Sequence, residues 1–271
     1  MPKKILFTDM DGTLLNSKKE ISPEMHALVR RMIDEGAYFV LSSGRALSSI
    51  LASAEKNNLL FDDTLIIAAN GNIVYDHNSR SCLVEKRVPL DIAEKIIAMA
   101  DEMGIHIQSY DDTYFICKKP CPEVDYYANW TGMKPRYADD LLAAYDRPPV
   151  KLLAVSLDDK PRLEELRRRV LEQFSHTLTA IFSCNEYLEF FDKTAGKGSA
   201  VEYVCQQLQI PLSESVAAGD AENDISMLEA AGCAVVMANA NAEVKKYADF
   251  ITEKDNDHDG LAEAICHYFF S

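Results

Sequence analysis

The sequence lacks any long apolar run. No window approaches the about 20 apolar residues that a membrane-spanning helix needs. The short apolar run after Lys4 ends at Asp9, whereas a signal peptide needs a longer stretch and a small-residue cleavage site. We therefore expect a cytoplasmic protein with no membrane partner.

The sequence also lacks paired cysteines. Seven cysteines, an odd number, are spread from Cys82 to Cys266, and the nearest pair, Cys117 and Cys121, has no second pair to complete a zinc site. The six histidines are equally scattered. We expect reduced thiols in a reducing compartment, and neither disulfides nor a histidine-based metal site.

Positive charge is scarce as well. With 28 Lys and Arg against 43 Asp and Glu, the 271-residue chain has a net charge of −15. Such a surface is repelled by nucleic acids and anionic membranes, so we expect neither as a partner. An anionic substrate would need positive charge placed locally in its site. Hydrophobic residues make up 48% of the chain, as in ordinary globular proteins.

The two ends of the sequence show an alternation of strands and helices. Residues 5–8 form a continuous apolar run, typical of a strand buried on both faces. Ser22 and Pro23 then open a helical stripe, and further strands are expected at 38–42 and 65–69 with a helix between them. The same rhythm returns after Gly196. This order predicts a doubly wound, Rossmann-like α/β core with a parallel sheet.

The middle of the sequence follows another pattern. Short runs at 106–110 and 114–117, separated by Asp111-Asp112, indicate a hairpin, and helical stripes flank them. We therefore expect an inserted α+β cap domain at 83–190, with the catalytic core formed by 1–82 and 191–271.

Acidic residues follow two of the expected core strands. Asp9 and Asp11 come directly after the first strand, and Asp220, Asn223 and Asp224 follow the strand at 215–218. Ligands of open α/β sheets bind at the carboxyl ends of the strands, so these side chains converge if the two strands are neighbours. Converging oxygen ligands suit Mg²⁺.

Groups that could hold a phosphate lie at two expected helix starts. Ser43-Gly44-Arg45 follows the second strand and offers a hydroxyl and backbone donors. Lys197, between Gly196 and Gly198, adds a point charge at the start of another helix.

Taken in order, Asp9-x-Asp11-Gly12-Thr13, Ser43, Lys197 and Gly219-Asp220-x-x-Asn223-Asp224 resemble the four motifs of the haloacid dehalogenase (HAD) superfamily. The large insert after the third strand resembles the Cof-type subgroup with a type-2B cap. Asn70-Gly71 also resembles that subgroup, whereas Asn72 and Ala238 stand where it usually has Ala and Gly.

The resemblance implies a magnesium-dependent phosphatase for small phosphorylated metabolites such as sugar phosphates. It implies that Asp9 is the nucleophile, that Asp11 is the general acid and base, and that Ser43 and Lys197 hold the transferring oxygens. The implied metal ligands are Asp9, Asp11 through its backbone carbonyl, Asp220 and Asp224. The implied phosphate-binding residues are Asp11, Gly12, Ser43, Gly44, Arg45, Lys197 and Asn223.

Other interpretations stay open at this point. The same site could serve a phosphotransferase or mutase, or a non-catalytic sensor of phosphorylated metabolites could retain the scaffold. Arg45 could be purely structural. Asp255, Asp257, Asp259 and Gly260 resemble part of a calcium loop, but Cys266 stands where that loop requires Glu, so we expect Asp259 to cap the last helix instead. The oligomeric state, monomer or homodimer, is undetermined by the sequence.

Overall fold

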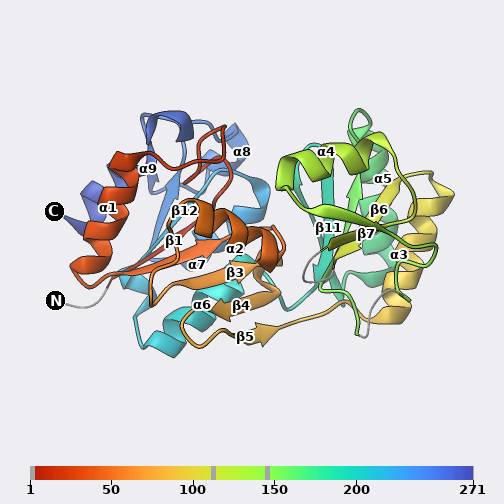
Figure 1. Ribbon diagram of the computed structural model, residues 1–271, viewed down its shortest axis with the longest axis horizontal. Helices are drawn as coiled ribbons and strands as arrows, with labels where there is room; N and C mark the ends of the chain where they lie inside the picture. The colour runs from red at the N-terminus through yellow and green to blue at the C-terminus, as the bar shows by residue number, and fades with distance from the viewer. Residues whose placement is uncertain (1–3, 111–113, 144–146, 271) are drawn as a thin grey trace. The chain divides into compact units, whose positions relative to one another are not determined.

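The computed structural model describes residues 4–110, 114–143 and 147–270 and divides into two compact units (Figure 1). The first comprises Met1–Gly44, Ile50–Leu83 and Gly196–Ser271, and the second comprises Arg45–Ser49 and Val84–Ala195. The predicted boundaries of core and cap, after residues 82 and 190, stay predictions. The expected Asp111-Asp112 turn lies outside the described residues.

The first unit is built on an eight-stranded sheet. Its strands, in spatial order, are β14 (Phe250–Ile251), β13 (Cys233–Val236), β12 (Ser215–Gly219), β1 (Ile5–Thr8), β2 (Tyr38–Ser42), β3 (Leu65–Ala68), β4 (Ile73–Asp76) and β5 (Ser81–Glu85). From β14 to β3 all neighbours pair in parallel, and β4 pairs antiparallel with β3. The expected doubly wound parallel core is confirmed.

Helices cover both faces of this sheet. They are α1 (Pro23–Asp34), α2 (Leu47–Lys56), α6 (Lys197–Leu208), α7 (Ile225–Ala230), α8 (Ala242–Lys245) and α9 (Leu261–Phe269), with short 3-10 turns η1 (Ala69–Gly71), η2 (Leu212–Glu214), η3 (Glu222–Asp224) and η4 (Asn256–His258). Helices α1 and α9 pack together on one face, and α6 packs with α7 on the other. All four residues of β1 are buried, as its apolar run predicts.

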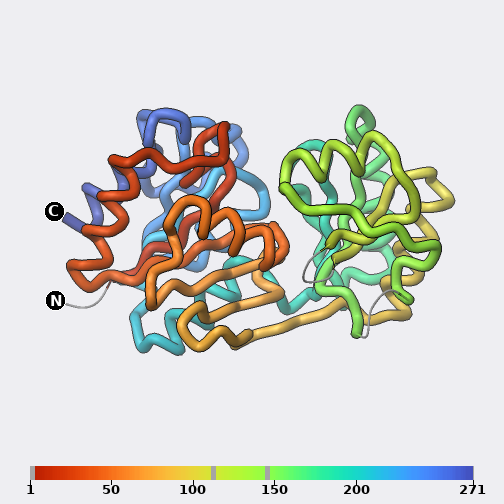
Figure 2. The backbone as a smooth tube through the Cα atoms, in the orientation of Figure 1, coloured from red at the N-terminus to blue at the C-terminus, as the bar shows by residue number. Residues whose placement is uncertain are grey.

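Local sequence signals explain where α1 begins and how it packs. The Ser22 side chain accepts a hydrogen bond from the backbone N–H of Met25, and Pro23 occupies the first turn, where its missing N–H costs nothing. Met25, Val29 and Met32 form its buried stripe. Both ends of the described chain lie in this unit (Figure 2), where the Lys4 ammonium donates to the backbone oxygen of Tyr268.

The second unit has its own sheet and core. Its strands, in order, are β10 (Leu178–Cys184), β11 (Tyr187–Asp192), β9 (Lys151–Val155), β6 (His106–Tyr110), β7 (Tyr114–Cys117) and β8 (Lys134–Tyr137). All pairs are antiparallel except β7 with β8. Apolar residues of α3 (Leu90–Glu102) and α5 (Lys160–Phe174) fill the core against this sheet, while α4 (Pro122–Thr131) contributes to a second cluster. This mixture is the α+β architecture expected for the insert.

One expected helix cap is wrong. Asp259 has a left-handed backbone (φ +57°), and Gly260 is the residue that precedes α9. The Asp259 carboxylate instead accepts a hydrogen bond from the Ser22 hydroxyl at 2.8 Å. Asp259 therefore ties the last loop to the start of α1. In the described part of the chain, no helix has the length and apolar character to cross a membrane.

Candidate active site

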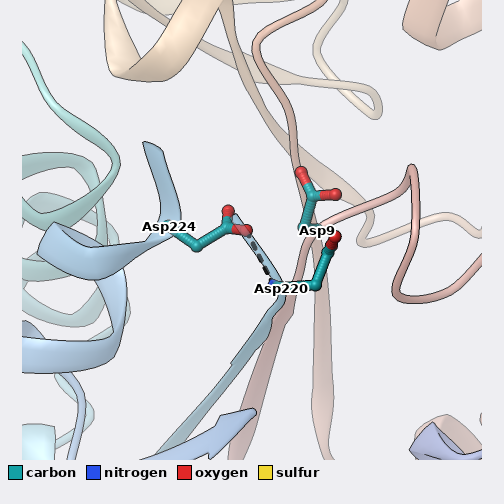
Figure 3. A group of neighbouring side chains, drawn as sticks. All are labelled: Asp9, Asp220 and Asp224. Carbon is teal, nitrogen blue, oxygen red and sulfur yellow. Dashed lines mark hydrogen bonds between the residues drawn. The ribbon is translucent and has the colours of Figure 1, made fainter. Parts of the chain in front are cut away.

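Three acidic side chains meet at the carboxyl edge of the parallel sheet. Asp9 follows β1, Asp220 follows β12, and Asp224 ends η3. Because β1 and β12 are paired neighbours, with Thr8 opposite Ala218, their ends lie side by side. One carboxylate oxygen from each residue lies within 4.8 Å of the others, and the side chains point toward one another (Figure 3).

Backbone geometry fixes these carboxylates. The Asp9 N–H donates to the Ala218 oxygen at 2.9 Å, and Asp224 Oδ2 accepts from the N–H groups of Asp220 and Ala221 at 3.0 Å. A Cβ at Gly219 would lie only 2.5 Å from Asp224 Cβ, so the close approach of the η3 turn requires glycine there.

The Asp220 side chain is also held in place: its Oδ1 accepts a hydrogen bond from the Thr13 hydroxyl at 2.8 Å. The three acids are thus held in place by hydrogen bonds from the surrounding protein.

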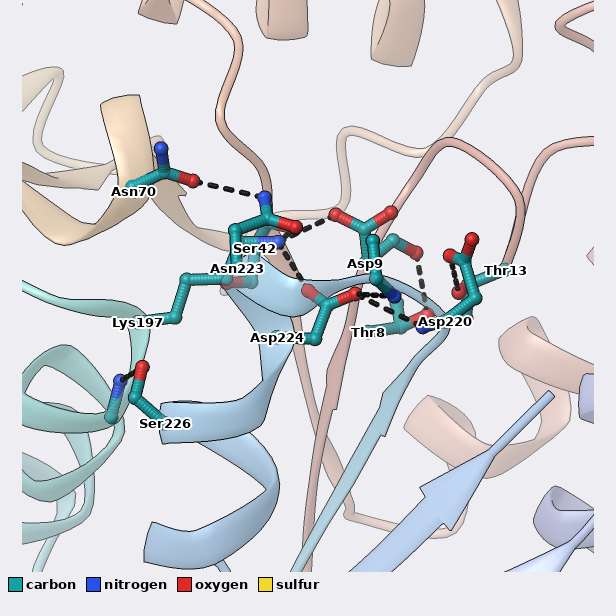
Figure 4. A network of polar contacts seen from close by, with 12 residues as sticks. Thr8, Asp9, Thr13, Ser42, Asn70, Lys197, Asp220, Asn223, Asp224 and Ser226 are labelled. Atoms are coloured by element: carbon teal, nitrogen blue, oxygen red, sulfur yellow. Dashed lines mark hydrogen bonds and ion pairs between the residues drawn. The ribbon is translucent and has the colours of Figure 1, made fainter. Parts of the chain in front are cut away.

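Lys197 places a positive charge within this acidic group (Figure 4). Its ammonium lies 2.6 Å from Asp9 Oδ1, 2.6 Å from Asp224 Oδ1 and 3.2 Å from the Ser42 backbone oxygen. The residue is only 1% exposed. Because a buried ammonium is costly unless it is paired and hydrogen-bonded, these contacts are what allow Lys197 to be charged there.

Burial, together with the neighbouring carboxylates, raises the pKa values of the aspartates at this site. Burial raises the pKa of Asp9 well above its usual value; Lys197 opposes this shift, and the neighbouring carboxylates add to it. Burial and Asp224 raise the pKa of Asp220 to about 7, against the hydrogen bond from Thr13. Burial alone would lower the pKa of Lys197, but Asp224 and Asp9 outweigh it and raise the pKa, which keeps the ammonium protonated.

The group therefore has the character of a divalent-cation site. Asp9, Asp220 and Asp224 supply carboxylate oxygens, which Mg²⁺ prefers. Burial is the main cause of the raised pKa values of Asp9 and Asp220, and the neighbouring carboxylates add to it against the single Lys197 ammonium. These residues fit such an ion.

Asp11 and Gly12 lie in the loop that follows Asp9. Gly12 has φ +81°, and a Cβ there would lie 2.5 Å from the Asp220 carboxylate, so glycine is required. The Gly12 oxygen accepts a hydrogen bond from Asn239 at 2.8 Å. The side chain of Asp11 does not join the acidic group; its Oδ1 pairs with Lys19 at 2.7 Å.

The other candidates lie at neighbouring strand ends. Ser43 is buried after β2; its N–H donates to the Ile67 oxygen at 2.8 Å, and its carbonyl accepts from the Asn70 N–H at 3.1 Å. The Asn223 amide donates to the Asn70 side-chain oxygen at 3.1 Å (Figure 4). Gly44 follows Ser43, whereas Arg45 is buried and groups with the second unit. The roles predicted for these residues stay predictions.

The sequence patterns did not indicate the roles of Thr13, Asn239 and Lys19. The hydroxyl of Thr13 supports Asp220, Asn239 holds the Gly12 carbonyl, and Lys19 pairs with Asp11. Thr13 stands within the first acidic motif, which is a signal that could have been followed. Asn239 and Lys19 contact the site through loops whose course local patterns do not define.

Comparison with known proteins supports this picture. Residues 6–265 match the family model described as haloacid dehalogenase-like hydrolase. The chain is 30% identical to the 5-amino-6-(5-phospho-D-ribitylamino)uracil phosphatase YcsE of Bacillus subtilis (98% of this chain and 95% of the relative are covered). It is 28% identical to the pyridoxal phosphate phosphatase YbhA of Escherichia coli, with 98% of both chains covered.

A solved structure of a haloacid dehalogenase-like hydrolase from Bacteroides thetaiotaomicron superposes with a TM-score of 0.88. It has 29% identity to this chain, and 98% of this chain and 100% of that chain are covered. The likeness thus extends over both units.

Proposed function

Because the chain belongs to the haloacid dehalogenase-like hydrolase family, we propose that it is a Mg²⁺-dependent phosphatase that hydrolyses phosphomonoesters of small metabolites through an aspartyl-phosphate intermediate. The observation that carries this proposal is the meeting of Asp9, Asp220 and Asp224 around the buried Lys197 ammonium. The resemblance noted in the sequence motifs and the predicted enzyme class, a phosphoric monoester hydrolase, are confirmed by the family match and by the phosphatase relatives.

The substrate class is supported by the relatives. The names of YcsE and YbhA describe phosphate esters of small organic molecules. A chain similar to both over nearly its full length is well suited to such metabolites, and its net charge of −15 disfavours nucleic acids. The cytoplasmic location expected from the sequence stays a prediction.

In the proposed reaction, Asp9 Oδ attacks phosphorus and the leaving oxygen takes a proton from Asp11. Water then attacks phosphorus of the aspartyl-phosphate and gives a proton to Asp11. The bond between phosphorus and the Asp9 oxygen breaks, and the Asp9 carboxylate is regenerated. Lys197, next to the nucleophile, stabilises negative charge on the transferring oxygens, and Ser43 would hydrogen-bond one of them. A Mg²⁺ ion held by Asp9, Asp220 and Asp224 would supply charge neutralisation between these carboxylates and the phosphate.

The site would serve a mutase equally well, since only the acceptor of the phosphoryl group differs. Water as acceptor gives inorganic phosphate, whereas a mutase returns the phosphoryl group to an organic hydroxyl. A non-catalytic sensor is disfavoured because the predicted nucleophile and acid, Asp9 and Asp11, are both present.

The test is hydrolysis of 4-nitrophenyl phosphate with and without EDTA. We expect activity to disappear after metal removal and to return with Mg²⁺. Asp9→Asn should abolish turnover because an amide is a poor nucleophile, whereas the control Asp34→Asn, on the exposed face of α1, should retain it. Full activity without a divalent cation, or turnover near the wild-type rate in Asp9→Asn, would refute the proposed mechanism.

A further inference from the structure

Lys19 has a backbone conformation that lysine rarely adopts. It lies in the loop between β1 and α1 with φ +61°, in the left-handed region. Glycine or asparagine would occupy this conformation at lower cost. The contacts of the Lys19 side chain therefore decide whether this conformation serves a function.

The surrounding chain holds Lys19 in this conformation. Its N–H donates to the Asn16 oxygen at 2.9 Å, and its carbonyl accepts from the Asn57 side chain at 3.3 Å. The buried Asn57 amide also accepts from the Ile21 N–H at 3.1 Å and donates to the Ser53 oxygen of α2 at 2.9 Å. Through Asn57, the loop is therefore tied to the end of α2 at the Lys19 carbonyl and at the Ile21 N–H.

The side chain of Lys19 reaches the carboxylate predicted to be the general acid. Its ammonium lies 2.7 Å from Asp11 Oδ1, and the two side chains are only 24% and 23% exposed. The neighbouring Lys18 is exposed on the same loop. A charged hydrogen bond that is largely shielded from solvent, with its donor fixed at the backbone, restricts the orientation of its acceptor more than a surface ion pair does.

We propose that Lys19 is a positioning residue for Asp11. This inference rests on the proposed function. By binding Oδ1, the Lys19 ammonium orients the Asp11 carboxyl group so that Oδ2 exchanges the proton in both steps.

In the first step the Asp9–phosphorus bond forms, the bond to the leaving oxygen breaks, and that oxygen takes its proton from Asp11. In the second step the water oxygen bonds to phosphorus and gives a proton to Asp11, while the bond between phosphorus and the Asp9 oxygen breaks and its electron pair returns to Asp9. Lys19 keeps its proton throughout.

The test is the kinetics of Lys19→Met on phenyl phosphate and 4-nitrophenyl phosphate. Phenolate is a poor leaving group that needs the proton, so kcat/KM for phenyl phosphate should fall about tenfold or more. 4-Nitrophenolate leaves without help, so its kcat/KM should change less than about threefold. Its kcat should fall together with its KM, because hydrolysis of the phosphoenzyme still needs Asp11 as the base.

The Lys19→Gly variant tests whether a loss of activity comes from the missing ammonium or from a destabilised fold. It removes the ammonium but suits the left-handed backbone, so we expect a Tm at least equal to that of the wild type together with the same kinetic defect. Lys19→Arg should recover part of the lost activity, and Lys18→Met, the matched control, should behave as the wild type. In an Asp11→Asn background, Lys19→Met should have no further effect, since its role is exerted through Asp11.

Equal losses on both substrates, or losses that multiply with those of Asp11→Asn, would overturn the role of Lys19. That failure is distinct from failure of the proposed function: a phosphatase that needs Asp9 and Asp11 but is indifferent to Lys19 contradicts only this inference, whereas activity that survives Asp9→Asn contradicts the mechanism beneath it.

Discussion

A single lysine side chain balances much of the negative charge at the site. Lys197 is fully enclosed, and its ammonium contacts the carboxylates of Asp9, which follows β1, and Asp224, which ends η3. It therefore links the proposed nucleophile to the η3 turn, and its charge is already oriented before a phosphate binds. Preorganised charge of this kind is a large contributor to transition-state stabilisation.

Lys197→Ala should lower kcat/KM by a factor equivalent to about 2–4 kcal/mol of transition-state stabilisation, the scale of losing one preorganised charge contact. Lys197→Arg should not restore full activity, because the planar guanidinium cannot occupy the space of a compact ammonium between two carboxylates. Steady-state kinetics on 4-nitrophenyl phosphate measure both, with the exposed Lys246 changed to Ala as a control. A neutral result for Lys197→Ala would remove Lys197 from the mechanism.

For the individual residues, the sequence predicted the meeting of the three acids but not the hydrogen bonds and ion pairs of the residues around them. Asp9, Asp220 and Asp224 follow strands whose apolar runs are unmistakable, so their meeting followed from the topology of a parallel sheet. The contact between Lys19 and Asp11 depends on a left-handed backbone and on a hydrogen bond from Asn57, just after α2, which no local pattern encodes.

At the scale of elements, the short turn η1 joins three of the predicted motifs. Its residues Ala69, Asn70 and Gly71 all have positive φ, at +49°, +56° and +89°. The backbone of Asn70 binds Ser43, its side chain binds Asn223, and Gly71 packs against the Gly196 carbonyl that precedes Lys197. Such strain persists only where the surroundings impose it, which is common at functional sites.

Gly71→Ala should lower the free energy of unfolding by about 2–4 kcal/mol. The added Cβ would lie 2.1 Å from the Gly196 oxygen, in addition to the strain of φ +89°. Gly36→Ala is a matched control, since its φ is +95° but nothing lies within 4 Å of a Cβ. Urea unfolding of both variants separates clash from strain, and equal destabilisation would show that the close approach to Gly196 is unimportant.

The elements that the sequence did not indicate are those without a strong pattern. Strand β5 is mostly exposed and β8 carries Lys134 and Arg136, so neither shows an apolar alternation. Asp259 has a left-handed backbone, and the N-cap of α9 is Gly260, one residue beyond the expected cap. Strand β1 and helix α1 were predicted well, because full burial gives β1 a continuous apolar run and burial of one face gives α1 a helical apolar period.

For the whole molecule, the acidic group makes stability depend on pH and on metal. The pKa of Asp220 is raised from 3.8 to about 7, so between these values the folded state binds more protons than the unfolded state. Stability from this group is therefore present at low pH and lost as pH rises through about 7.

In EDTA, the Tm should fall by several degrees between pH 5 and pH 8.5 relative to that of Asp220→Asn, in which the titrating carboxylate is absent. Added Mg²⁺ should raise the wild-type Tm at pH 8.5, because a bound cation offsets the repulsion. Differential scanning calorimetry measures these shifts. A wild-type Tm that follows the variant at every pH would mean that Asp220 does not titrate in this range.

The clustered acids and the second sheet lie in different units. All three clustered acids and Lys197 belong to the first unit, and the second has its own sheet and core. A phosphatase site that recognises only the phosphoryl group has no basis for choosing among metabolites, so the organic part of the substrate must be recognised elsewhere. We propose that the second unit, predicted from sequence as a cap, supplies this selectivity.

Changes in cap loops should therefore alter substrate preference and leave metal dependence intact. The loop around Ser183, Cys184 and Asn185, where β10 ends, is our candidate within the described residues; Asn185 accepts a hydrogen bond from Lys160 at 3.0 Å, and Cys184 is exposed. For Asn185→Ala and Cys184→Ala we expect the ratio of kcat/KM between two sugar phosphates to change by about tenfold, equivalent to about 1.4 kcal/mol. The Mg²⁺ concentration for half-maximal activity should not change.

Arg168→Ala, on the exposed face of α5, is the control. A panel of sugar phosphates, nucleotides and a folded phosphoprotein provides the measurement. A preference order unmoved by the loop variants, or efficient dephosphorylation of the phosphoprotein, would show that selectivity does not reside in this loop or that the site is open to macromolecules.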